Sequence, residues 1–215
     1  MADLAREAEQ LDVAVGRDLG RHRGHPAIRA AAALTELADQ PPLLALSGAV
    51  VLAGLATGDA RLAKAGGRML ASVAIATLIK GAVKRTLSRT RPNVLLDQGR
   101  YEVRALGPDE GPWHSFPSGH TAGAVAAAHA LAGVYPEARL PAYAGAAAVA
   151  AALVPSARHY PADVAAGAAI GLASAALTDL IWRNLADRLA LPPEGDAAEL
   201  APLGSDGTAE RRRPA

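Results

Sequence analysis

Residues 43–57 read LLALSGAVVLAGLAT, a run of 15 residues without a charged side chain. Four further segments share this apolar character, and the five are about 13 to 18 residues long. The four are Met69–Val83, Thr121–Val134, Ala142–Val154 and Val164–Ile181. A helix needs roughly 20 residues to cross a bilayer, and capping residues can extend each segment to that length. Because none of the five has a substantial polar face, the sequence predicts membrane helices rather than a water-soluble bundle.

The composition also favours closely packed helices. Hydrophobic residues make up 51% of the 215 residues and aromatic residues only 3%, so most of the apolar content is Ala, Val and Leu. Strands prefer β-branched and aromatic side chains, whereas small residues such as Gly167 and Gly171 allow close helix contacts in lipid. We therefore expect an all-α fold, an integral-membrane bundle of about five transmembrane helices with one or two amphipathic helices at the N-terminus.

Charge and cysteine content exclude several other classes. The formal net charge is +1, which gives no reason to expect nucleic acid as a partner. The absence of cysteine removes disulfides, thiolate nucleophiles and cysteine-based metal sites. Acidic residues interrupt the first 40 residues, so no signal peptide is expected and a secreted soluble enzyme is disfavoured.

The chain divides by composition into three parts. Residues 1–40 carry an apolar stripe that includes Leu4 and Leu11, and they are interpreted as amphipathic helices at the membrane interface or packed on the remainder. Residues 41–190 form the membrane-embedded domain. Residues 191–215 are rich in Pro, Gly and charge, and we expect them to be disordered.

Polar residues suited to a phosphate stand at three boundaries of the apolar segments. Lys84 ends the second segment, and Arg91-Pro92 follows after six residues. The third segment begins with Pro117-Ser118-Gly119-His120, and the last with His159-Tyr160-Pro161-Ala162-Asp163. If alternate helices are antiparallel, all three boundaries lie on the same side of the membrane.

Each of these residue types has a physical reason to bind an anion or to attack it. Lys and Arg neutralise phosphate charge. Ser118 and Gly119 lie at a helix N-terminus, where free backbone N–H groups favour an anion that the ring of His120 can also face. His159 and Asp163 are four residues apart on one helix face, so that the carboxylate can orient the imidazole as a nucleophile. The other basic residues of the long loop, Arg85, Arg89, Arg100 and Arg104, are interpreted as solvated.

The set Lys-x6-Arg-Pro, Pro-Ser-Gly-His and His-x3-Asp, in this order, resembles the type 2 phosphatidic acid phosphatases (PAP2), a superfamily that includes vanadium haloperoxidases. The resemblance covers about residues 43–182. It implies a lipid phosphate or diphosphate hydrolase that works without a metal or other cofactor. It also implies that His159 attacks phosphorus to form phosphohistidine, that Asp163 orients His159, and that His120 protonates the leaving oxygen. Lys84, Arg91, Ser118 and Gly119 would hold the phosphate.

One position departs from the family pattern. The family has an Arg six residues before the nucleophilic His, and this chain has Leu153 there. Either Arg158 supplies the missing phosphate contact or the site has one cation fewer, which leaves open a catalytically weakened lipid-phosphate-binding protein. A phosphatase of small soluble esters is a further alternative, and a haloperoxidase is disfavoured. A metal site from His120, His159 and Asp163 is also disfavoured, because Lys84 and Arg91 would repel the ion.

The predicted partners are a phosphorylated lipid and the membrane, and the oligomeric state is not readable. Basic residues between the first two apolar segments (Arg61, Lys64 and Arg68) and at the C-terminus lie opposite the predicted site. By the positive-inside rule, that end is cytoplasmic and the site faces outward from an inner cell membrane. The N-terminal arginines argue the other way.

Overall fold

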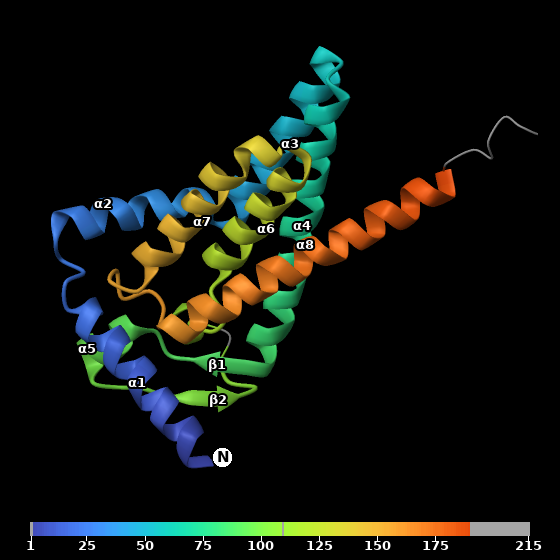
Figure 1. The fold of residues 1–215 in the computed structure, drawn as a ribbon. Coiled ribbons are helices and arrows are strands. Elements are labelled where there is room, and N and C mark those ends of the chain that lie inside the picture. The colour runs from blue at the N-terminus through green and yellow to red at the C-terminus, as the bar shows by residue number, and fades with distance from the viewer. Residues whose placement is uncertain (1, 109, 190–215) are drawn as a thin grey trace, which may run out of the picture. The chain divides into compact units, whose positions relative to one another are not determined.

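The computed structural model describes residues 2–108 and 110–189, so the predicted disorder of residues 191–215 lies outside the described residues. The chain forms two compact units, Met1–Ile181 and Trp182–Ala215, and the last described helix ends in the second. Everything that follows concerns the first unit, whose elements are shown in Figure 1.

The N-terminal residues form helices α1 (Ala2–Gly20) and α2 (Pro26–Thr35), followed by the short 3-10 helix η1 (Glu36–Ala38). His25 begins α2, since its Nδ1 accepts from the Ala27 amide at 3.2 Å and Pro26 occupies the first helical position. Leu4 and Leu11 of α1 are exposed. Apolar side chains exposed along one helix agree with the predicted amphipathic N-terminus.

All five predicted apolar segments are helical. They are α3 (Gln40–Thr57), α4 (Ala60–Thr86), α6 (Gly119–Val134), α7 (Arg139–Leu153) and α8 (Pro161–Leu189), with the 3-10 helix η3 (Pro136–Ala138) between α6 and α7. Among the described residues, α3, α4 and α8 are long and apolar enough to cross a membrane, whereas α6 and α7 have 16 and 15 residues. Large side chains such as Leu52, Leu78 and Leu172 remain exposed on the long helices, as expected of surfaces that face lipid. The all-α membrane fold is confirmed.

Helices α6 and α8 approach each other closely because two glycines of α8 face α6. A Cβ on Gly167 would lie 2.5 Å from the Ser118 carbonyl oxygen, and one on Gly171 would lie 2.6 Å from that of Ala122. Any larger residue would force these helices apart, which confirms the contact predicted for this pair. The close approach brings the start of α8 against the start of α6.

The long polar segment between α4 and α6 is folded rather than open. It forms strand β1 (Leu87–Arg89), helix α5 (Pro92–Gln98), strand β2 (Val103–Ala105) and the 3-10 helix η2 (Gly111–Trp113). The strands pair antiparallel, with Leu87 opposite Ala105 and Arg89 opposite Val103. This hairpin was not predicted. Figure 1 shows it together with α1 and α5 at the end of the bundle where α4 ends.

Candidate active site

The three predicted boundaries meet at one end of the bundle. The Ser118 amide, before α6, donates to the Asp163 carbonyl oxygen of α8 at 3.0 Å. Lys84, near the end of α4, donates from Nζ to the His114 carbonyl oxygen at 2.9 Å. The last residue of β1 is joined to the same loop, because the Ser115 amide donates to the Arg89 carbonyl oxygen at 3.0 Å. Residues from three distant stretches of sequence therefore surround one site.

His159 is held in a single tautomer by a backbone carbonyl. Its side chain is only 2% exposed, and Nδ1 lies 2.7 Å from the carbonyl oxygen of Ser115. A carbonyl oxygen can only accept a hydrogen bond, so Nδ1 carries the proton. The lone pair is consequently on Nε2, which is the nitrogen available for attack.

Asp163 is fully buried beneath His159 and receives several hydrogen bonds. Its Oδ2 accepts from the Ser115 hydroxyl at 2.5 Å and from the Tyr160 amide at 2.7 Å, and its Oδ1 accepts from Arg89 Nη1 at 2.8 Å. The distance from Oδ2 to His159 Nδ1 is 3.8 Å, which is too long for a hydrogen bond. Asp163 is therefore connected to His159 through Ser115, whose carbonyl oxygen accepts from the imidazole, and through Tyr160, the next residue in the chain.

The surroundings of His159 favour the neutral imidazole. Burial lowers the pKa of His159, Asp163 opposes that shift, and the positive charges of Arg91 and Lys84 add to it, so the net pKa is below its ordinary value. A neutral imidazole is the form that can act as a nucleophile.

His120 lies beside His159 at the start of α6. The two ring centroids are 6.4 Å apart, with an interplanar angle of 63°. Nε2 of His120 is 4.0 Å from Asp39 Oδ1, and within the described residues this buried nitrogen has no hydrogen-bond partner. A second imidazole with an uncommitted nitrogen next to the nucleophile is placed to transfer a proton.

Groups suited to binding an anion surround the start of α6. Ser118 is the N-cap residue, and its Oγ accepts from the Thr121 amide at 3.4 Å. Helix α4 contributes Lys84, and Arg91 is the N-cap residue of α5. Burial and then the charge of Arg158 lower the pKa of Arg91, which shows that cations are crowded together here. Free helix amides and clustered cations favour a bound anion.

Lys80 belongs to this cluster, although sequence reasoning did not assign it to the site. It lies one turn before Lys84, and a Cβ on Gly119 would be only 2.9 Å from its Nζ. Its ammonium group therefore lies against the N-terminus of α6, where the helix dipole repels a cation unless an anion is also present. The spacing of four residues from Lys84 on one helix face was the signal that could have found it.

Arg89 corrects the interpretation of the loop arginines as solvated. It is only 6% exposed and pairs with Asp163 and with Asp12 of α1. Ser115 is a second participant that sequence reasoning left without a role. No local pattern identifies either residue, because their partners are far away in the sequence.

Arg158 and Leu153 show how the departure from the family pattern is accommodated. Leu153 is fully buried, and its carbonyl oxygen accepts from the amides of Arg158 and His159 at 3.2 and 3.3 Å. The Arg158 guanidinium pairs with Glu36 and donates to the Thr35 hydroxyl at 3.3 Å. The Arg158 guanidinium therefore lies near enough to Arg91 for their charges to interact, but it is already paired with the Glu36 carboxylate.

One group of potential metal ligands is present among the described residues, and it is not the set considered from sequence. Glu36, Asp39 and His120 have ligand-type atoms within 4.8 Å of one another. Glu36 is paired with Arg158. The cluster is partly exposed and acidic, and such groups are common without an ion.

Two curated relatives share part of their length with this chain. A lipid A 1-phosphatase of Rhizobium etli is 32% identical over 132 residues, which are 60% of this chain and 56% of the relative. A lipid A 1-phosphatase of Rhizobium johnstonii is 33% identical over 132 residues, 60% of this chain and 53% of the relative. The chain thus spans about half the length of these relatives.

The crystal structure of Aquifex aeolicus LpxE has a similar fold, with a TM-score of 0.61 at 22% identity. The likeness covers 79% of this chain and 95% of that one. Residues 65–186, more than half of the chain, match the PAP2 superfamily. This range includes Lys84, Arg91, His120, His159 and Asp163. The resemblance drawn from the three motifs is therefore confirmed, and the chain belongs to the PAP2 superfamily.

Proposed function

We propose that this protein is a metal-independent phosphatase that hydrolyses a lipid phosphate or diphosphate through a phosphohistidine. The observation that carries the proposal is the state of His159, whose Nδ1 is committed to the Ser115 carbonyl while Nε2 keeps its lone pair. Clustered cations and a second imidazole adjoin it. The likeness to two lipid A 1-phosphatases supports the same reaction class.

The proposed reaction has two steps. His159 Nε2 attacks phosphorus, the bond from phosphorus to the ester or anhydride oxygen breaks, and His120, which enters this step as imidazolium, gives a proton to that oxygen and becomes neutral. Water then attacks the phosphohistidine, His120 takes a proton from it, and the phosphorus–nitrogen bond breaks to release inorganic phosphate. Lys84, Arg91, Ser118 and the Gly119 amide stabilise the negative charge that develops on the phosphoryl oxygens.

A substrate panel tests this function. Phosphate release is measured in detergent from lipid A 1-phosphate, phosphatidate, phosphatidylglycerol phosphate, a polyprenyl diphosphate and p-nitrophenyl phosphate, each with and without EDTA. We expect release from at least one lipid, faster than from the soluble ester and unaffected by EDTA. Preference for the soluble ester would reject the lipid substrate, and loss of activity in EDTA would reject a metal-free mechanism.

The burial of Leu153 at the family's Arg position favours a second candidate, a lipid-phosphate-binding protein with weak turnover. Loss of one charge-assisted donor costs roughly 2–4 kcal/mol of transition-state stabilisation. This candidate predicts saturable binding of one panel lipid with no release of phosphate above that of a His159→Ala variant.

Lys80 and Arg158 are the two cations that can compensate for Leu153. Because Arg158 is paired with Glu36 whereas Lys80 lies against Gly119, we expect Lys80→Met to lower kcat/KM by roughly 10- to 100-fold and Arg158→Ala by less. Lys64→Met, on the exposed far end of α4, is the matched control and should change nothing. A larger loss for Arg158→Ala would assign the role to Arg158, and no loss for either variant would reject compensation.

The state of His159 also predicts the pH dependence. Because its pKa is lowered, His159 stays neutral as the pH falls through about 6.5, the ordinary value for histidine, and loses its lone pair only below that. The acid limb of kcat/KM should therefore lie below pH 6.5. The profile is measured from pH 4 to 9, with the titration of the substrate phosphate determined separately. An acid limb whose midpoint lies at or above pH 6.5 would contradict a desolvated nucleophile, whereas loss of activity on the alkaline side reports deprotonation of His120.

We further propose that the site faces outward from the cell membrane. The α3–α4 and α6–α7 turns lie together at the end opposite the site, since Arg61 Nη2 is 2.9 Å from Glu137 Oε1. The basic residues near that end favour the cytoplasm. A cysteine introduced at Arg100 should react with an impermeant maleimide in intact cells, and one at Glu137 should not; the reverse result overturns the proposed orientation.

A further inference from the structure

The buried contacts of Arg89 connect the N-terminal helix to the reaction centre. Its Nη1 is 2.8 Å from Asp163 Oδ1, and its Nη2 is 2.6 Å from Asp12 Oδ2 of α1. The side chains of Arg89 and Asp12 are only 7% and 11% exposed. Ion pairs this well shielded from water are much less screened than surface pairs, so the guanidinium has a defined position.

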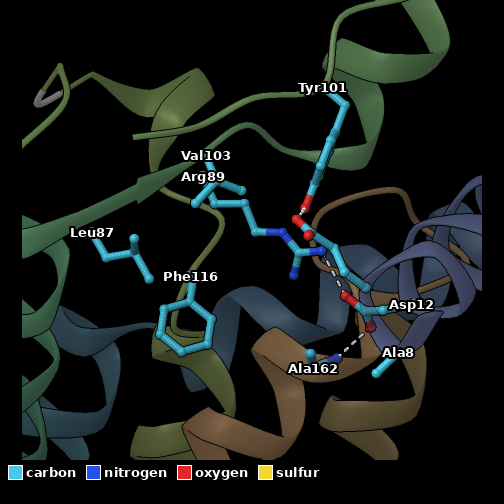
Figure 2. A pocket seen from close by; sticks show the side chains of 9 residues that line it. Ala8, Asp12, Leu87, Arg89, Tyr101, Val103, Phe116 and Ala162 are labelled. Carbon is cyan, nitrogen blue, oxygen red and sulfur yellow. Dashed lines mark hydrogen bonds and ion pairs between the residues drawn. The ribbon is translucent and has the colours of Figure 1, made fainter. Parts of the chain in front are cut away.

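Asp12 also makes a second contact, which Figure 2 shows beside the first. Its Oδ1 accepts from the Ala162 amide at 2.7 Å, in the first turn of α8. One carboxylate of α1 therefore satisfies a free amide at the N-terminus of α8 and holds the arginine that binds Asp163. Both contacts act on the helix turn that contains Asp163, directly after His159.

The surface of α1 is shaped to fit this turn. A Cβ on Gly16 would lie 2.4 Å from the Tyr160 ring, so only glycine allows the helix to come this close. Arg89 stacks on the same ring, 4.0 Å from its centroid. The Tyr101 ring packs edge-on against that of Tyr160, with centroids 5.7 Å apart, and the Tyr101 hydroxyl donates to Glu9 of α1 at 2.6 Å.

We propose that Asp12 and Arg89 are positioning residues of the phosphatase reaction, and that α1 contributes to the active site through Asp12. Asp12 fixes Arg89, and Arg89 fixes the Asp163 carboxylate. Asp163 in turn holds the Ser115 hydroxyl and the Tyr160 amide, so the carbonyl that orients His159 and the backbone that carries it are both fixed. This inference rests on the proposed function, because it assigns a cause to the orientation of the nucleophile.

The test compares Asp12→Asn with wild type in the purified full chain. We expect kcat to fall by roughly 10-fold or more while KM changes by less than about twofold, because Lys84, Arg91 and Ser118 are untouched. Inhibition by orthovanadate, which mimics five-coordinate phosphorus bound to the nucleophile, should weaken by the same factor as kcat. A residue that only supports the fold would lower the amount of active protein and leave the vanadate affinity of the remainder unchanged.

The matched control is Asp18→Asn on the same helix. Its carboxylate is exposed and pairs with the surface residues Arg17 and Arg21 at the end of α1, so both kinetic constants should stay at wild-type values. Asp12→Glu keeps the charge and should recover part of the lost kcat. Wild-type kcat in Asp12→Asn, or an equal loss in Asp18→Asn, would overturn the proposal.

A cavity of about 290 Å³ lies beside Asp12 and Arg89, so water can reach the Arg89 guanidinium when Asp12 is replaced by Asn. A second variant is included in case Asp12→Asn still does not fold. Arg89→Lys keeps the charge but cannot reach both carboxylates at once, so it should show the same selective loss of kcat. Full kcat in this variant would also overturn the proposal. If wild type and His159→Ala release phosphate equally, the proposed function itself fails; if wild type alone is active and both test variants match it, only the positioning role fails.

Discussion

Replacement of His159 by Ala is expected to abolish phosphate release, lowering kcat by roughly 10⁴-fold or more, as the loss of a catalytic nucleophile does in other hydrolases. The protein should remain able to bind the lipid phosphate, because Lys84, Arg91 and Ser118 do not depend on the imidazole. Phosphate release is measured in detergent. In parallel, the wild-type protein is incubated with a substrate that carries radioactive phosphate, and the protein is tested for a covalent label that acid removes.

The control for this experiment is His22→Ala, which removes an exposed histidine from the turn after α1 and should leave turnover unchanged. The label on the wild-type protein should be lost in His159→Ala and retained in His22→Ala. Turnover that persists in His159→Ala would exclude a phosphohistidine at His159, whatever substrate is used.

The second large effect is expected for Asp163→Asn, with kcat reduced by roughly 10³-fold or more. The Asn side chain has a single acceptor oxygen, and its NH₂ group only donates, so Ser115, Tyr160 and Arg89 cannot all keep their bonds. The buried Arg89 would also lose one of its two counter-charges, which is costly in a desolvated position. The orientation of His159 should suffer more than phosphate binding, so KM should change much less than kcat.

Thermal unfolding in the same detergent separates this effect from loss of the fold. A lower melting temperature is expected, since a buried ion pair is broken, but the protein should be folded at the assay temperature. If the folded Asp163→Asn protein keeps more than a tenth of wild-type kcat, Asp163 does not position the nucleophile.

Much of the fold could be predicted because the membrane imposes a simple pattern. Uncharged segments separated by polar turns leave few alternatives to helices, and all five became α-helices. The motifs at the helix boundaries could be predicted for a similar reason. Lys84, Ser118 and His159 lie where helices end or begin, and alternate helices return these ends to one side.

The support of the site could not be predicted, because it depends on contacts between distant residues. Asp12 meets Arg89 across 77 positions, and Ser115 meets Asp163 across 48. Neither Asp12 nor Arg89 differs in its local sequence from a surface charge, and only the fold of the β1–β2 hairpin and α1 makes them buried. The expectation that Asp163 orients His159 rested on their spacing of four residues, and spacing alone could not show that the Ser115 carbonyl oxygen accepts from His159 Nδ1.

The bond between Asp12 and the Ala162 amide joins residues 150 positions apart, one in α1 and the other in α8. During synthesis the ribosome makes α1 first, and α1 has no partner for this contact until α8 has been inserted. Under the proposed positioning role, a partly translated chain would hold its phosphate-binding cations without an ordered nucleophile. Hydrolysis would thus begin only when α8 is in the bilayer, and the nascent protein would not attack membrane lipids before that point.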